Sequence, residues 1–135
     1  MIRPVVFDAS AIVGFILDPR SHPLVVETIE DEAYEILVPH VCDLEIASAL
    51  RRGVGRGLTD VGRARAALRL YLGLPLERLS HLPSLERVFE IRENFTAYDA
   101  AYVALAESFE APPYTADGRL ARAVREHTRV HAAEV

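Results

Sequence analysis

Four acidic residues of this 135-residue chain stand in apolar stretches, where charged side chains are rare unless they are paired or bind a metal ion. They are Asp8, Glu45, Asp99 and Asp117. Clustered carboxylates raise one another's pKa, and a hard divalent cation such as Mg²⁺ removes that conflict. A site of this kind can activate water and stabilise a leaving oxygen in phosphodiester hydrolysis. If the four acids meet in space, they predict a metal-dependent hydrolase.

Each acid also has a structural explanation. Asp8 and Asp117 precede helical stretches and would serve as N-caps. Asp99 falls in the first turn of an expected helix, where it would complement the helix dipole. Glu45 lies in mid-helix with Val41 and Ala49 one turn away, and neither can pair with it. A solvated helix face is the alternative for Glu45, so the case for a site rests on the four acids together.

The elements that must position these acids alternate along the chain, which indicates a parallel sheet with helices on both faces in one domain, residues 1–135. Strands are predicted at 2–7, 36–38, 77–81, 113–115 and 129–131. Helices are predicted at 9–17, 22–31, 40–52, 83–93, 97–109 and 118–126, with a further helix from an N-cap at Thr59 to residue 72 after a break at 53–57. Asp8 and Asp117 then follow strand ends at one edge of the sheet, where open α/β sheets bind ligands.

Composition excludes several other functions. A lone cysteine, Cys42, rules out an internal disulfide and a multi-cysteine zinc site. No apolar segment is long enough to span a bilayer and no signal peptide is evident, so we expect a soluble intracellular protein. All 15 basic residues are arginine, and the missing lysine argues against receiver domains, haloacid-dehalogenase-type phosphatases and P-loop enzymes. Neither a GxSxG turn nor an HExxH motif is present.

Four short motifs occur in an order that resembles PIN domains, and among them the VapC-type toxins of toxin–antitoxin pairs. The resemblance spans the chain, and the motif at 98–106 is the most specific of the four. The motifs are Val6-Phe7-Asp8-Ala9-Ser10-Ala11, Glu45-Ile46-Ala47-Ser48-Ala49-Leu50, Tyr98-Asp99-Ala100-Ala101-Tyr102-Val103-Ala104-Leu105-Ala106 and Thr115-Ala116-Asp117-Gly118-Arg119-Leu120. Two features depart from the family: Ser48 replaces a frequent asparagine, and Pro112-Pro113 precede Thr115.

The resemblance implies a three-layer α/β/α sandwich with a four- to five-stranded parallel sheet. It also implies a cytoplasmic endoribonuclease that uses Mg²⁺ or Mn²⁺, forms homodimers and is inhibited by a VapB-type antitoxin. Asp8, Asp99 and Asp117 would be the metal-binding acids. Glu45 would position or deprotonate the attacking water, or complete the metal shell. The alternative is a catalytically inactive PIN-like module whose acidic pocket binds an arginine of a partner protein.

Further residues are candidates for supporting roles. Ser10, Ser48 and Thr115 are expected to hydrogen-bond the acids or their waters. RNA must be held by positive groups, although the formal net charge is −5. Arginine suits bidentate phosphate contact, and the candidates are Arg119 and Arg122 beside Asp117, and Arg52 in a second cluster with Arg51 and Arg56.

Overall fold

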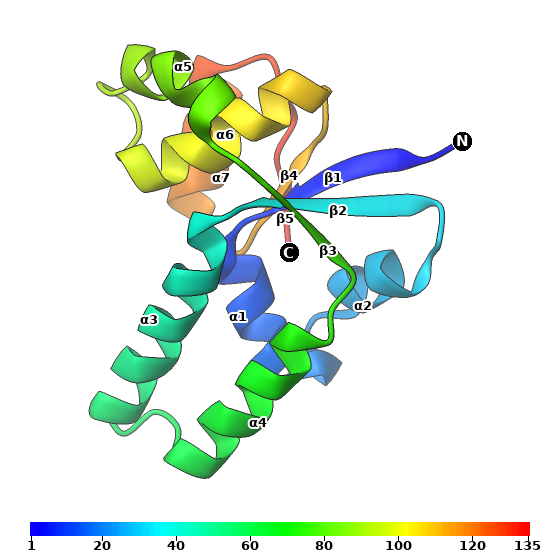
Figure 1. Ribbon diagram of the computed structural model, residues 1–135, viewed down its shortest axis with the longest axis vertical. Coiled ribbons are helices and arrows are strands. Elements are labelled where there is room, and N and C mark those ends of the chain that lie inside the picture. The colour runs from blue at the N-terminus through cyan, green and yellow to red at the C-terminus, as the bar shows by residue number, and fades with distance from the viewer.

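The computed structural model describes residues 1–135, and its strands form one parallel sheet (Figure 1). The strands are β1 (Arg3–Phe7), β2 (Tyr34–Pro39), β3 (Leu76–Leu79), β4 (Pro113–Thr115) and β5 (Ala133–Glu134). They lie in the order β3-β2-β1-β4-β5, so the first strand of the chain is central. All four pairs of neighbours are parallel. The five-stranded parallel sheet confirms the predicted fold class.

Helices cover both faces of the sheet, with α5, α6 and α7 on one side and α1, α2 and α4 on the other (Figure 1). The α-helices are α1 (Ala9–Leu17), α2 (Pro23–Glu30), α3 (Val41–Gly55), α4 (Val61–Leu72), α5 (Leu85–Glu90), α6 (Ala97–Phe109) and α7 (Gly118–His127). Short 3₁₀ turns η1 (Pro19–Ser21) and η2 (Leu82–Ser84) precede α2 and α5. None of these helices combines the length and the apolar character needed to cross a membrane.

The central elements are apolar because they are covered on both sides. Val5, Val6 and Phe7 of β1 are all buried, as expected for a strand with helices on both faces. In α6 the whole stretch Ala100–Ala106 is buried, since α6 packs against β1 and β2 on one side and α5 on the other. Small alanines allow this close approach, so α6 places its first turn firmly beside the end of β1.

Helices α3 and α4 form a hairpin that extends from the carboxyl edge of the sheet (Figure 1). The predicted break at 53–57 was too early, because α3 continues through Gly53 to Gly55. The chain turns instead at Gly57, whose φ of 70° suits glycine. The predicted N-cap of α4 was also wrong: the Asp60 carboxylate accepts from the Arg63 amide at 2.8 Å, whereas the buried Thr59 hydroxyl has no partner.

Other element boundaries also differ from prediction. The helix predicted at 83–93 is the η2 turn followed by the shorter α5, and β2 is longer than the predicted 36–38. The last strand was predicted at 129–131 but lies at Ala133–Glu134. Pairing with β4 decides this position, because Ala133 is in register with Tyr114 and the Val135 amide donates to the Thr115 carbonyl at 2.9 Å. Such a short strand has no pattern of its own in the sequence.

Candidate active site

Asp8 is held at the end of the central strand, where it caps α1. Its Oδ1 accepts from the Ala11 amide at 3.0 Å and from the Ser10 hydroxyl at 2.7 Å. Its Oδ2 accepts from the Thr115 hydroxyl at 2.6 Å. Ser10 and Thr115 thus make the contacts predicted for them. Asp8 is only 6% exposed, and its hydrogen bonds to α1 and β4 fix the direction of the carboxylate.

The junction between β4 and α7 is tied to the same point. The Asp117 amide donates to Thr115 Oγ1 at 3.0 Å, and the Ala116 amide donates to Ser10 Oγ at 3.0 Å. Asp117 Oδ1 then caps α7 by accepting from the amides of Arg119 and Leu120. Because these links join both strand ends, Asp8 and Asp117 are positioned by one hydrogen-bond network.

Asp99 and Glu45 approach from two helices. Thr96 caps α6 by accepting from the Asp99 amide at 3.1 Å, which leaves the Asp99 carboxylate outside the cap. No ion pair of the structure includes Asp99. Glu45 projects from α3, and its Oε1 accepts from the Tyr102 hydroxyl at 2.6 Å. Tyr102 lies one turn after Asp99 on α6, so a single helix presents one acid and orients another.

All four carboxylates line one cavity of about 410 Å³ at the carboxyl edge of the sheet, which confirms their predicted convergence. Their roles in metal binding and catalysis stay predictions. The other residues that line this cavity, called here the acidic cavity, are Ala9, Ser10, Val13, Ala49, Arg52 and Tyr102.

The charges in the acidic cavity are poorly balanced. Burial raises the pKa of Asp8, Glu45 and Asp99 above the ordinary values, and repulsion from neighbouring acids adds to the effect. Asp117 repels both other aspartates, while Asp99 and Asp8 repel Glu45. When its carboxylates are ionised, the acidic cavity therefore favours the binding of a cation.

The donor chemistry fits a hard cation held partly through water. No three acidic, histidine or cysteine side chains converge closely enough to hold a metal ion directly. Mg²⁺ commonly takes one or two protein carboxylates and keeps several waters. A cavity lined by four carboxylates, three of them with a raised pKa, has the oxygen donors for such binding.

Comparison with known proteins decides the family. The sequence model of the PIN-domain family matches residues 5–126. This chain belongs to the PIN-domain family. Its relatives include Ribonuclease VapC9 of Mycobacterium tuberculosis, 40% identical over 117 residues that cover 86% of this chain and 87% of the relative. Ribonuclease VapC1 of the same organism is 38% identical over 119 residues, covering 87% and 89%. These relatives confirm the resemblance to VapC toxins.

Two solved structures share the fold. PAE2754 from Pyrobaculum aerophilum superposes with a TM-score of 0.70 at 23% identity, covering 97% of this chain and 83% of its own. VapBC2 from Rickettsia felis, bound to a DNA fragment from its promoter, gives a TM-score of 0.64 at 10% identity, covering 97% and 98%. At these identities the likeness concerns the fold alone.

The predicted role of Ser48 in this PIN domain is not supported by its contacts. Its hydroxyl accepts from Arg52 Nη1 at 2.9 Å and makes no hydrogen bond with Glu45. The hydroxyl is short and points along α3, whereas Glu45 turns toward α6 and Tyr102. Sequence reasoning missed Tyr102, although its position three residues after Asp99 places both on one helix face.

The three arginines proposed for RNA contact differ in position. Arg52 lines the acidic cavity and lowers the pKa of Glu45, opposing the stronger effect of burial. Arg119 is exposed beside Asp117, with Nε 4.0 Å from Oδ1. Arg122 is exposed and outside the acidic cavity. Arg52 is therefore the one of the three that lines the acidic cavity.

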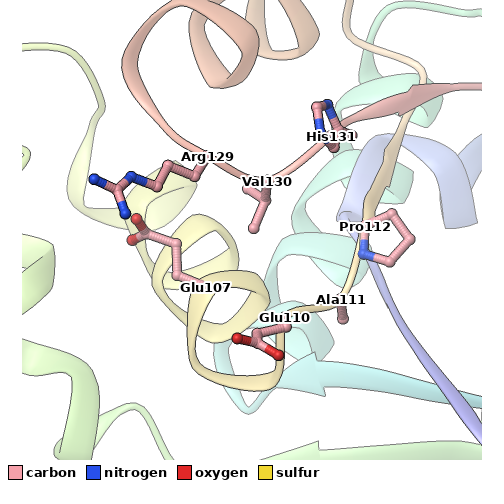
Figure 2. A pocket seen from close by; sticks show the side chains of 7 residues that line it. All are labelled: Glu107, Glu110, Ala111, Pro112, Arg129, Val130 and His131. Carbon is pink, nitrogen blue, oxygen red and sulfur yellow. The ribbon is translucent and has the colours of Figure 1, made fainter.

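A larger cavity of about 650 Å³ lies at the amino end of β4, and none of the four acids of the acidic cavity lines it (Figure 2). Figure 2 shows Arg129 and His131 on one side of this cavity and Glu107 and Glu110 on the other. Charges of both signs line it, and Glu107 is already paired with Arg87. Its size alone does not indicate a reactive site.

Proposed function

We propose that this PIN domain is a divalent-cation-dependent endoribonuclease and the toxin of a toxin–antitoxin pair. The observation that carries the proposal is the convergence of four carboxylates from β1, α3, α6 and the β4–α7 junction in one cavity. The relatives named VapC ribonucleases support RNA as the substrate. The VapBC2 likeness supports an antitoxin partner.

Asp8, Asp99 and Asp117 would hold Mg²⁺ or Mn²⁺, one or two of them directly and the rest through water. When bound, the cation supplies the positive charge that offsets an RNA phosphate and the leaving oxygen of hydrolysis. The residues of the chain do the positioning: Ser10 and Thr115 fix Asp8, and both oxygens of Asp8 already accept hydrogen bonds. This preorganisation keeps the carboxylate in place before substrate arrives.

Glu45 is the acid best placed to act on water. The Tyr102 hydroxyl occupies Oε1, which leaves Oε2 free to orient a water or to accept its proton. Water oxygen then attacks phosphorus, the phosphodiester P–O bond breaks, and the leaving oxygen takes up a proton. The raised pKa of Glu45 brings it nearer to that of an efficient general base at neutral pH.

The direct test is incubation of purified protein with total RNA and Mn²⁺, with and without EDTA. Cleavage that disappears in EDTA supports the proposal. A chain that binds metal but never cleaves RNA would instead favour the inactive binding module, whose acidic cavity takes an arginine of a partner protein.

We propose that the antitoxin also places a basic segment in the acidic cavity, because the net charge of the residues that line this cavity is negative.

Replacing Tyr102 by Phe is expected to slow cleavage at neutral pH by roughly tenfold, because a hydrogen bond to a charged group is lost. The Tyr102 hydroxyl lowers the pKa of Glu45, so the variant has a higher Glu45 pKa. The acidic limb of the pH–rate profile should therefore move to higher pH, with recovery in alkaline buffer. Tyr34→Phe is the control, because Tyr34 lies at the amino end of β2 and outside the acidic cavity. An unmoved acidic limb would remove Tyr102 from the role of positioning Glu45.

We also propose a homodimer. Large apolar side chains are exposed on α3, η2, α5 and α6, and Tyr98 lines one groove with Leu44 and another with Leu85. Monomeric proteins seldom leave large contiguous apolar patches uncovered. The residues are Leu44, Leu82, Leu85, Phe89 and Tyr98. Sedimentation at micromolar concentration is expected to show a dimer, and Phe89→Ser to shift it toward the monomer. A wild-type monomer at high micromolar concentration would contradict the dimer and leave the catalytic proposal intact.

A further inference from the structure

Positive charge is concentrated in the α3–α4 hairpin. Residues 51–69 contain six of the 15 arginines and a single acid, Asp60, which gives this stretch a net charge of +5. The remaining residues carry nine arginines against 19 acids, a net charge of −10. An acidic protein that binds a polyanion needs such a local basic region, because its average field repels the ligand.

The arginines of the hairpin are free to bind a ligand. All six are exposed, and none forms an ion pair within the chain. Five of the other nine arginines are paired with acids. Unpaired guanidinium groups packed into one hairpin repel each other, so their placement costs stability that bound phosphates would recover. The six are Arg51, Arg52, Arg56, Arg63, Arg65 and Arg69.

The arginines connect the acidic cavity with a groove of the hairpin. Arg52 lines the acidic cavity, and its neighbour Arg51 lines a groove of about 330 Å³ between α3 and α4. Arg65 lines the same groove from α4, and Arg69 follows one turn later. The other lining residues of this groove are all apolar: Ala47, Leu50, Val54, Val61, Ala64 and Leu68.

We propose that this groove and its arginines bind single-stranded RNA beyond the scissile phosphate, an inference that rests on the proposed ribonuclease function. Arg51, Arg65 and Arg69 contact phosphates, while an unstacked base lies on the apolar groove between two guanidinium groups. Arg52 connects this surface to the acidic cavity. Duplex RNA fits poorly, because its bases are stacked and cannot enter such a groove.

The test measures binding of a short, labelled single-stranded RNA of mixed sequence in EDTA, where cleavage does not interfere. The variant combines Arg51→Gln, Arg65→Gln and Arg69→Gln. A charge-matched control combines Arg20→Gln, Arg92→Gln and Arg129→Gln, all exposed arginines without ion pairs elsewhere on the chain. Arg129 lines the cavity at the amino end of β4, together with Ala111 and Pro112 (Figure 2). Thermal melting confirms that both variants fold.

The hairpin variant is expected to lose affinity for the RNA by roughly tenfold or more. The slope of log K against log[salt] should become less negative by about 2, because three contacts to a single strand are lost. The control should keep the slope of the wild type. An unchanged slope and affinity in the hairpin variant would overturn the proposal. So would an equal loss in both variants, because it would indicate a general charge effect. Failure of the ribonuclease proposal is recognised separately, by a wild type that does not cleave RNA with Mn²⁺.

Discussion

Asp99→Asn is expected to reduce Mn²⁺-dependent RNA cleavage by roughly a hundredfold or more. The change removes a negative charge that helps to bind the metal ion, and metal-assisted catalysis lowers the activation free energy of cleavage by several kcal/mol. The same variant should unfold at a slightly higher temperature than the wild type when metal is absent. Burial and the charges of Asp117 and Asp8 raise the pKa of Asp99, so its ionised form destabilises the folded state at neutral pH. Asparagine keeps the size and removes this penalty.

Asp99 is a sharper test than the other two aspartates. Its carboxylate does not cap α6, since the Thr96 hydroxyl does. Asp8 uses both oxygens to accept hydrogen bonds, so Asp8→Asn also disturbs structure. Asp117 caps α7 with its Oδ1, so a change at Asp117 also alters a helix cap.

The two measurements are RNA cleavage with Mn²⁺ and thermal melting in EDTA. Asp18→Asn is the control, because Asp18 is exposed at the far end of α1 and outside the acidic cavity. It should cleave RNA like the wild type. Full cleavage by Asp99→Asn would falsify the metal mechanism, and a large loss of stability would show that Asp99 has a structural role.

The positions of Asp8 and Asp117 were predictable because they follow strands. Strand β1 ends in the apolar run Val5-Val6-Phe7, directly before Asp8, and parallel strands bring their carboxyl ends to one edge of the sheet. Glu45 stood out because a charge among apolar residues in mid-helix requires an explanation. Local pattern therefore located the acids, and sheet topology brought them together.

Contacts between elements were not predictable in the same way. The hydrogen bond from Tyr102 to Glu45 joins residues 57 positions apart and depends on how α6 lies beside α3. Tyr102 is 2% exposed, and in sequence it looks like an ordinary core residue. The position of β5 and the N-cap of α4 could not be predicted for a similar reason. Long-range pairing with β4 decides the first, and the direction of the Asp60 side chain decides the second.

Mn²⁺ is expected to stabilise the protein, by about 2.7 kcal/mol when the free metal is a hundredfold above its dissociation constant. This stabilisation should increase from pH 5 to pH 7. Burial raises the pKa of Asp8, Glu45 and Asp99 above the unfolded values near 4, so metal must compete with protons at low pH. Without metal the sign is opposite: a raised carboxyl pKa gives stability that is present below about pH 4 and is lost as the pH rises through the folded value.

The difference between melting temperatures with Mn²⁺ and with EDTA, followed across pH, separates the metal effect from all other titrations. Asp43 is one such titrating group. Hydrogen bonds from Tyr71 and Arg78 lower the pKa of its carboxyl group, so its contribution to folding stability is lost as the pH falls. That contribution is the same with and without Mn²⁺, so it cancels in the difference. Asp99→Asn should lose most of the stabilisation by Mn²⁺, whereas Asp18→Asn should keep it. A stabilisation that is absent, or that does not change with pH, would mean that the carboxylates of the acidic cavity do not bind the metal.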